Sequence, residues 1–419
     1  MTIPMQWVSA LSKRPSLEAA VAEVVQRAQT SLSSPADLGL IFISSAFASE
    51  FSRLLPLLHD YLPNLPLIGC GGGGVIGMTS PTIATEVEEE AALVLTLAAL
   101  PGVQVRTFHL LTDELPDLDS PPDAWMELTG ATASEKPQFI LVADPFSGNI
   151  NDLLQGLDYA FPNSHIVGGL AGATPSSGST GLFRDTKLHR EGVVGVALSG
   201  NIVLDTIVAQ GCRPIGQPYI VTEGERNIVL GLQEQTLPSA KSYSASTVSQ
   251  KRTPLEMLQD LVQTLSDEER SLAQRALFVG IAQNEFKQTL EAGDFLIRQL
   301  LGVDPQVGAI AIGDRIRPGQ RIQFHLRDAR ASADDLEALL KRYCQEKTGP
   351  AEAGALMFSC VGRGEGLYNE PDFDSDLFHR YLPGVPLSGF FCNGEIGPVG
   401  NSTFLHGYTS VFGIIRSQL

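Results

Sequence analysis

The hydrophobic positions of the chain alternate between short apolar runs and segments with helical spacing. Residues 38–43 form a continuous apolar run that predicts a buried strand. The preceding residues, 17–28, repeat their apolar side chains at the spacing of an amphipathic helix, with Ser16 as its cap. Apolar runs at 139–143 and 355–360 predict further buried strands. Strands that alternate with helices indicate an α/β fold.

One sequence pattern recurs near both ends of the chain. Residues 59–77 (HDYLPNLPLIGCGGGGVIG) and 379–397 (HRYLPGVPLSGFFCNGEIG) align without gaps and match at more than half of their positions. A weaker copy occupies residues 161–172 (FPNSHIVGGLAG). The sequence therefore predicts a strand-helix-Gly-loop-strand unit that occurs at least three times.

Closely spaced strands follow two of these Gly-rich stretches. Residues 91–98 are followed by a second predicted strand at 103–110, and residues 193–198 by one at 202–209. Such close succession predicts antiparallel pairing within each couple. Together with the strands separated by helices, this predicts two related α/β domains with mixed β-sheets flanked by helices, built from the repeated units.

The length and one polar segment suggest where the domains divide. A chain of 419 residues exceeds what one hydrophobic core usually holds. Residues 233–252 are polar and rich in serine, and they separate two segments with strong apolar periodicity, so we interpret them as a linker or loop. This interpretation predicts a first domain over residues 1–232 and a second over 253–419.

Composition excludes several classes of partner. Acidic residues outnumber basic ones by 47 to 29, and the net charge of -18 argues against binding of nucleic acid or anionic membranes. The five cysteines are far apart and form no C-x-x-C pair, so neither a disulfide framework nor a zinc cluster is indicated. No export signal and no membrane span is recognisable, and we expect a cytoplasmic protein.

The first Gly-rich loop is a candidate binding site. Gly71, Gly72, Gly73 and Gly74 follow a predicted strand, and successive glycine N–H groups can form a concave nest for an anion. No Lys-Ser or Lys-Thr pair follows the glycines, so they do not form a P-loop. The alternative interpretation is that the glycines allow strands to pack closely.

The equivalent loop near the carboxyl terminus offers side chains instead of bare backbone. Cys392, Asn393 and Glu395 lie in this loop, and His406 follows shortly after it. A thiol, a carboxylate and an imidazole can form a nucleophile with its base. The alternative is an inert packed thiol, because free cysteine is among the most buried residue types. Because no catalytic motif is recognisable, we predict ligand binding at these residues and no enzymatic activity.

Arg363 is a further candidate ligand-binding residue. It lies in a Gly-rich run, residues 361–366 (VGRGEG), directly after the predicted strand 355–360. Open α/β sheets place ligand-contacting loops at such strand ends, and a guanidinium group can hold a ligand carboxylate. The alternative is an exposed loop arginine that pairs with Glu365 or with water.

Segments in both halves resemble the FIST family. In the second half the similar runs are residues 308–314 (GAIAIGD), 319–328 (GQRIQFHLRD) and 404–413 (FLHGYTSVFG). They are similar to the FIST C domain. In the first half the strand at 38–43, the loop at 69–77 and residues 211–216 (GCRPIG) resemble the amino-terminal FIST domain. The resemblance covers nearly the whole chain.

The resemblance implies a sensory role without enzymatic activity. It implies binding of a small ligand, such as an amino acid or another small anion, and signalling through a partner protein. One alternative is a protein-recruiting scaffold without a small ligand. A second alternative is a haem-binding nitric-oxide sensor, for which His109, His165 and His406 are the candidate axial ligands. The scattered histidines indicate no dedicated metal site, and we assign no cofactor.

Overall fold

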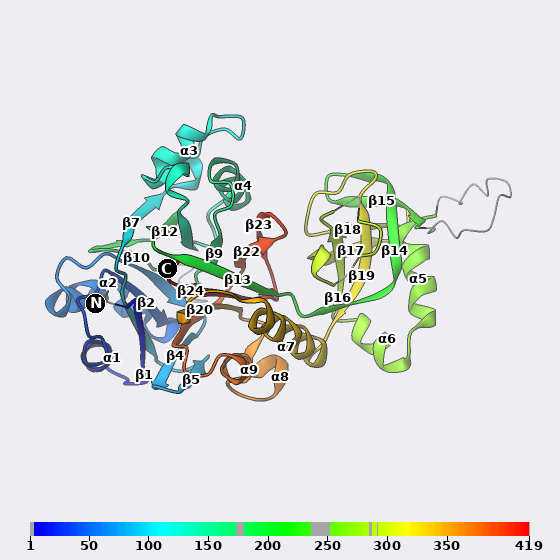
Figure 1. Cartoon of the computed structure of the whole chain (residues 1–419). Coiled ribbons are helices and arrows are strands. Elements are labelled where there is room, and N and C mark those ends of the chain that lie inside the picture. The colour runs from blue at the N-terminus through cyan, green and yellow to red at the C-terminus, as the bar shows by residue number, and fades with distance from the viewer. Residues whose placement is uncertain (1–3, 173–179, 236–251, 285–286, 291, 419) are drawn as a thin grey trace. The chain divides into compact units, whose positions relative to one another are not determined.

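The chain forms two compact units in a computed structural model that describes residues 4–172, 180–235, 252–284, 287–290 and 292–418 (Figure 1). Unit 1 comprises Met1–Ala209 and Leu336–Leu419, and unit 2 comprises Gln210–Asp335. Unit 2 is therefore an insertion in the sequence of unit 1. The predicted linker, residues 233–252, falls within the span of unit 2, and its residues 236–251 lie outside the described part of the chain.

Unit 1 contains three copies of one motif, as the sequence repeat predicts. The first repeat consists of β1 (Gln6–Ser12), α1 (Leu17–Ser31), β2 (Leu38–Ser44), α2 (Phe51–Tyr61), β3 (Leu67–Gly72), β4 (Val75–Ser80), β5 (Ile83–Val87) and β6 (Leu93–Ala99). The second consists of β7 (Val103–Leu110), α3 (Pro122–Thr129), β8 (Gln138–Ala143), α4 (Ile150–Ala160), β9 (Ile166–Leu170), β10 (Leu182–Arg184), β11 (Lys187–His189) and β12 (Val193–Gly200). In each repeat the strands on either side of the second helical connection are parallel.

The third repeat is interrupted by unit 2. Its elements in unit 1 are β13 (Val203–Ala209), most of α7 (Ala329–Glu346), β20 (Glu352–Cys360), α8 (Gly364–Tyr368), α9 (Phe373–Tyr381), β21 (Leu387–Cys392), β22 (Glu395–Val399), β23 (Ser402–His406) and β24 (Ser410–Arg416). In the first two repeats, the first strand is followed by a connection that carries a helix, α1 or α3. In the third repeat, unit 2 is inserted at this point, directly after β13.

The three repeats exchange hairpins in a closed cycle. The strand orders are β1-β6-β2-β3-β10-β11, β23-β22-β9-β8-β12-β7 and β13-β24-β20-β21-β4-β5. Each repeat supplies four adjacent strands of one sheet, and its hairpin extends the sheet of another repeat. These mixed sheets, flanked by helices, confirm the predicted fold class.

The predicted pairing of closely spaced strands is wrong. β6 pairs with β1 and β2 rather than with β7, and β12 pairs with β7 and β8 rather than with β13. The chain leaves one repeat and enters the next between these strands, so they belong to different sheets. In each repeat the last strand pairs with the first strand of the same repeat instead.

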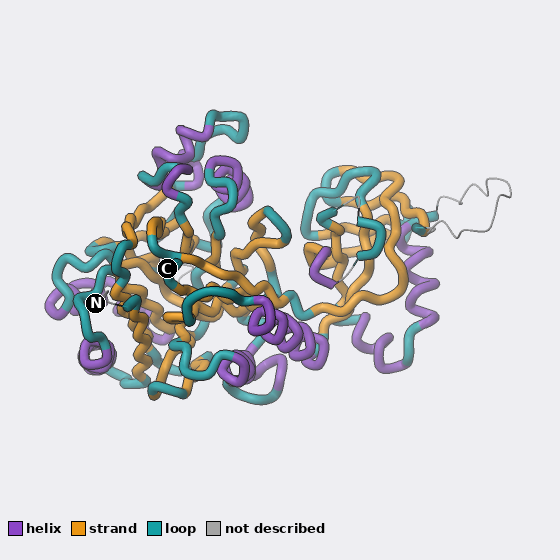
Figure 2. Tube along the Cα trace, viewed as in Figure 1, coloured by secondary structure: helices purple, strands orange, loops and turns teal. Residues whose placement is uncertain are grey.

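The inner faces of the three sheets share one apolar core. Phe42, Phe358 and Phe390 meet in it, with the Phe42 and Phe390 rings stacked at a centroid distance of 5.2 Å. The outer faces carry the helices: α1 and α2 on the first sheet, α3 and α4 on the second, and α7 and α9 on the third. Figure 2 shows these helices of unit 1 outside its strands.

Unit 2 is a closed barrel in the order β14-β15-β18-β17-β16-β19. Its elements are β14 (Cys212–Glu225), β15 (Ile228–Glu234), α5 (Pro254–Thr264), α6 (Asp267–Ala273), β16 (Leu277–Ala282), β17 (Phe295–Asp304), β18 (Ala309–Ile312) and β19 (Arg321–Arg327). Side chains of α5 pack into the same core as the strands. Across the described residues of both units, every helix is too short or too polar to cross a membrane.

Candidate functional site

The Gly-rich loops of the three repeats lie directly against one another. The Gly73 N–H donates to the Phe391 carbonyl at 3.0 Å, and the Gly172 N–H donates to the Gly71 carbonyl at 2.8 Å. Residues 71–74, 170–172 and 391–394 hold equivalent positions in the three repeats. We refer to these three loops together as the axial loops. The cyclic exchange of hairpins thus brings together loops that are far apart in the sequence.

The four glycines of the first axial loop are closely packed. A Cβ atom on Gly72 would lie 2.5 Å from the Gly74 carbonyl oxygen, and one on Gly74 would lie 2.4 Å from the Val87 carbonyl oxygen. The N–H groups of Gly71 and Gly73 donate to backbone carbonyls of neighbouring segments. These contacts favour the packing interpretation of the glycine run over an open nest for an anion.

Asn393 presents a polar side chain on the exposed side of the axial loops. Its backbone N–H donates to the Leu170 carbonyl at 3.1 Å, and its side-chain Nδ2 donates to the Ala171 carbonyl at 3.2 Å. The residue is nevertheless exposed, whereas its neighbours Cys392 and Gly394 are buried. No hydrogen bond to Oδ1 occurs within the described part of the chain, so this acceptor is available to a ligand.

The other predicted residues of this loop are buried beneath it. Glu395 and His406 face each other in the register of β22 and β23. Glu395 accepts a hydrogen bond from the Thr409 N–H at 3.0 Å, and His406 Nε2 lies 3.0 Å from the Gly397 carbonyl oxygen. Cys392 is fully buried, and its Sγ contacts a backbone carbonyl of β21 at 3.4 Å.

Burial makes the Cys392 thiol a weak acid. Burial, and to a lesser degree the nearby Glu395, raises the pKa of Cys392 well above its usual range. Burial also raises the pKa of Cys344, but this thiol is only half-buried, whereas Cys392 is fully buried. We therefore expect iodoacetamide at pH 8 to modify Cys344 first and Cys392 only after unfolding. Mass spectrometry of the native protein measures this order. Equal labelling of Cys392 and Cys344 would contradict the inert-thiol interpretation.

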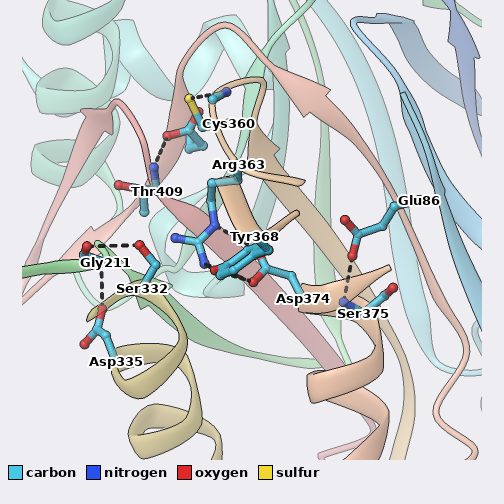
Figure 3. Close-up of polar contacts among 12 residues, drawn as sticks. Glu86, Gly211, Ser332, Asp335, Cys360, Arg363, Tyr368, Asp374, Ser375 and Thr409 are labelled. Atoms are coloured by element: carbon cyan, nitrogen blue, oxygen red, sulfur yellow. Dashed lines mark hydrogen bonds and ion pairs between the residues drawn. The ribbon is translucent and has the colours of Figure 1, made fainter. Parts of the chain in front are cut away.

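Arg363 is placed differently from both alternatives that the sequence suggests. Its side chain is completely buried. Its Nε and Nη2 atoms donate to the two carboxylate oxygens of Asp374 at 2.8 and 3.0 Å, and Nη2 also donates to the Tyr368 hydroxyl at 2.6 Å (Figure 3). The guanidinium fork therefore holds a carboxylate of the chain itself and ties the loop after β20 to α9.

Next to this ion pair lies a buried carboxyl group that the sequence analysis missed. Glu86 of β5 accepts a hydrogen bond from the Ser375 N–H at 2.8 Å (Figure 3). Its own N–H donates to Asp372 at 2.6 Å. Its Oε2 has no partner within the described residues. Burial, with the negative charge of Asp374, raises the pKa of Glu86 to about 8. The donated hairpin is thus anchored to α9 partly through the two hydrogen bonds of Glu86.

Glu86 should make the stability of unit 1 depend on pH. Between about pH 4.5 and pH 8 the folded state retains a proton that the unfolded state has lost, so stability falls as pH rises, by up to about 1.4 kcal/mol per pH unit. We expect Glu86→Gln to flatten this decline and to stabilise the protein at pH 8. Urea unfolding at several pH values measures the effect. The exposed Glu89→Gln is the matched control, and an unchanged slope in Glu86→Gln would contradict the assignment.

The ends of the first parallel strand of each repeat carry three different polar groups. In each parallel strand pair, a glycine of the second strand lies opposite a residue of the first strand, at the same register in all three repeats. Ser44, Asp144 and Cys360 each lie three residues after that opposite residue, so they occupy equivalent positions. Asp144 is buried and accepts hydrogen bonds from the hydroxyl groups of Thr180 at 2.8 Å and Ser147 at 3.0 Å. Aligning the three repeats strand by strand could have revealed this set of residues.

The three histidines that the sequence offers for haem each have a partner. His109 stacks on His189 at a centroid distance of 3.7 Å, and its Nε2 lies 2.9 Å from the Glu191 carbonyl oxygen. His165 Nδ1 contacts the Leu204 carbonyl. His406 is buried beneath the third axial loop. The three imidazoles therefore occupy separate environments within unit 1.

Comparison with known proteins covers both halves of the chain. A family model described as the FIST N domain matches residues 37–235, and one described as the FIST C domain matches residues 254–398. Among solved structures, cyanuric acid hydrolase from A. caulinodans aligns over 98% of this chain and 99% of its own, with a TM-score of 0.33 and 10% identity.

Two curated relatives show how far the similarity extends. An uncharacterised protein of Mycobacterium tuberculosis is 34% identical over 404 residues, which are 96% of this chain and 97% of that protein. An F-box/LRR-repeat protein of Arabidopsis thaliana is 24% identical over 364 residues, which are 77% of this chain and 67% of that protein. FIST domains are sensory domains of signal transduction, and the matches of both family models show that this chain belongs to the FIST family.

Proposed function

We propose that the chain is a sensory protein that binds a small ligand, such as an amino acid, at the axial loops of unit 1 and signals through a partner protein. The observation that carries the proposal is the convergence of three loops at strand ends, where α/β folds place ligands. Asn393 Oδ1, which accepts no hydrogen bond from the residues that the structure describes, is an acceptor that suits the ammonium group of an amino acid.

The equivalence of the loops supports a site of this kind. Gly73, Gly172 and Asn393 hold the same position in the three repeats, so two copies present backbone and one presents a side chain. The ligand would contact Asn393, with the close-packed glycines as supporting structure.

We also propose that the protein binds its ligand without transforming it. The buried thiol of Cys392 has a raised pKa, which disfavours a nucleophilic role. The buried Glu395 and His406 bond to neighbouring backbone groups, and Arg363 holds Asp374 instead of facing an open site. These contacts support a structural role for the side chains that could otherwise form a catalytic group.

A thermal-shift screen tests the proposal. Amino acids, organic acids, nucleotides and haemin are each added to the full chain, and a ligand at a hundred times its dissociation constant should stabilise the protein by about 2.7 kcal/mol. We expect Asn393→Ala to abolish this shift. Asn401→Ala is the matched control, because Asn401 is exposed in unit 1 but lies outside the axial loops.

The outcomes separate the alternatives. Absence of any shift, with a partner protein that co-purifies in equal amount, would favour the scaffold function. A Soret band after addition of haemin would favour the haem sensor. A ligand whose binding is unaffected by Asn393→Ala would show that the binding site lies elsewhere.

A further inference from the structure

A large groove runs along β1 in unit 1, away from the axial loops. It has a volume of about 940 Å³ and is lined by β1, by α1 and by the turn between β4 and β5. We call it the β1 groove. Trp7, Met78 and Pro81 give it apolar walls, and α1 contributes polar side chains such as Gln26. Its volume is within the range of sites that bind ligands or peptide segments.

β1 is the terminal strand of its sheet and pairs with β6 on one side, so its other backbone edge faces the groove, where Trp7 and Ser9 are 3% and 8% exposed. On β6, the Ala98 carbonyl accepts a hydrogen bond from the Asp37 N–H at 2.8 Å, so Ala98 directs its backbone groups toward β2. Trp7 is opposite Ala98 and must therefore direct its own N–H and C=O away from β6. Alternation along the strand gives Ser9 the same orientation. Two residues of the groove thus offer backbone donors and acceptors.

The groove carries an excess of positive charge within a chain of net charge -18. Arg27 donates to three uncharged carbonyl groups, those of Leu11 at 2.6 Å, Met78 at 2.9 Å and Thr79 at 2.8 Å. The other lining arginine, Arg14, pairs with Glu23 at 3.2 Å. Glu23 also lies close enough to Arg27 for the charge of Arg27 to lower its pKa, so the lining of two arginines and one glutamate carries one net positive charge, which an acidic group would complement.

A second groove lies between the first two repeats, where β7 and the turn after β10 take the places of β1 and the turn after β4, but where the lining helix is α2. There Asp185 accepts hydrogen bonds from the Leu67 N–H at 3.1 Å and from the Thr107 hydroxyl at 2.9 Å. That groove measures only about 360 Å³. In the β4–β5 hairpin Met78 holds the position of Asp185, so the β1 groove lacks this carboxylate, and Met78 instead donates its N–H to the Ser9 hydroxyl at 3.4 Å.

From these features we propose that the β1 groove binds an extended peptide of a partner protein, which adds to β1 as a further strand and places an acidic side chain near Arg27. Backbone hydrogen bonds to Trp7 and Ser9 would give affinity, and the lining side chains would give specificity. The inference does not depend on ligand binding at the axial loops.

The probe is a phage-displayed library of random heptapeptides, panned against the full chain. We expect enrichment of peptides that contain aspartate or glutamate, and the best one is synthesised and its affinity measured by fluorescence anisotropy. Gln26→Trp, on the groove side of α1, should weaken binding about tenfold. Gln29→Trp is the matched control, because Gln29 is exposed on the same helix but does not line the groove.

N-methylation of the peptide tests the strand geometry without altering the protein. A paired strand directs successive N–H groups to opposite sides, so methylation at alternate residues should abolish binding, while methylation at the residues between should be tolerated. Failure to enrich any peptide, equal binding to the Gln26→Trp and Gln29→Trp variants, or no alternation in the methylation series would each overturn the proposal.

Discussion

Replacing Arg363 by methionine is expected to lower the free energy of unfolding of unit 1 by about 3–5 kcal/mol. Methionine keeps the apolar stem but removes the guanidinium group, so the fully buried Asp374 loses its counter-charge. Urea unfolding followed by tryptophan fluorescence measures the loss. The signal reports on unit 1, because both tryptophans, Trp7 and Trp125, are buried there.

The control for this prediction is an arginine with exposed partners. Arg53 pairs with Glu18 and Glu50 at the surface of unit 1, and Arg53→Met should cost less than about 1 kcal/mol. In addition, Asp374→Asn in the Arg363→Met background should recover part of the loss, because the remaining buried group is then neutral. A loss below 1 kcal/mol in Arg363→Met would contradict a buried ion pair and reopen a ligand-binding role for this residue.

The sequence predicts the local elements of unit 1 well but not how they combine. Apolar runs such as residues 38–43 locate buried strands, because a strand covered on both faces excludes polar side chains. The pairing of β6 with β1 depends on contacts between segments about ninety residues apart, and no local pattern encodes it. The exchange of hairpins is likewise a property of the assembled repeats rather than of any one of them.

The candidate site was predictable only in part, for a related reason. The repeat in the sequence makes the loops of Gly71–Gly74 and Asn393 equivalent, but it does not predict that these two loops touch, as they do through the Gly73 N–H and the Phe391 carbonyl. The orientation of a side chain, however, depends on its partners: Arg363 turns inward because Asp374 and Tyr368 receive it. Glu86 is equally invisible in the sequence, since only the docking of its hairpin against α9 removes it from water.

One glycine recurs at the same register of all three parallel strand pairs, and we expect alanine there to destabilise unit 1 strongly. A Cβ atom would lie 1.8 Å from the Ile41 carbonyl oxygen at Gly69, and 1.7 Å from the Met357 carbonyl oxygen at Gly389. Backbone on an adjacent strand cannot move aside as a side chain can. Gly69→Ala and Gly389→Ala should therefore each destabilise unit 1 by about 3 kcal/mol or more.

The same clash occurs in the middle repeat, where a Cβ atom on Gly168 would lie 1.8 Å from the Leu141 carbonyl oxygen. If the three repeats are physically equivalent, Gly168→Ala must be as damaging as the other two changes. Gly366→Ala is the control, because a Cβ atom there meets nothing within 4 Å and alanine favours the α8 helix. A urea midpoint near the wild-type value for any of the three variants would contradict the prediction. It would show that the two parallel strands of that repeat can move apart to accommodate a Cβ atom, so that glycine is not required at that register.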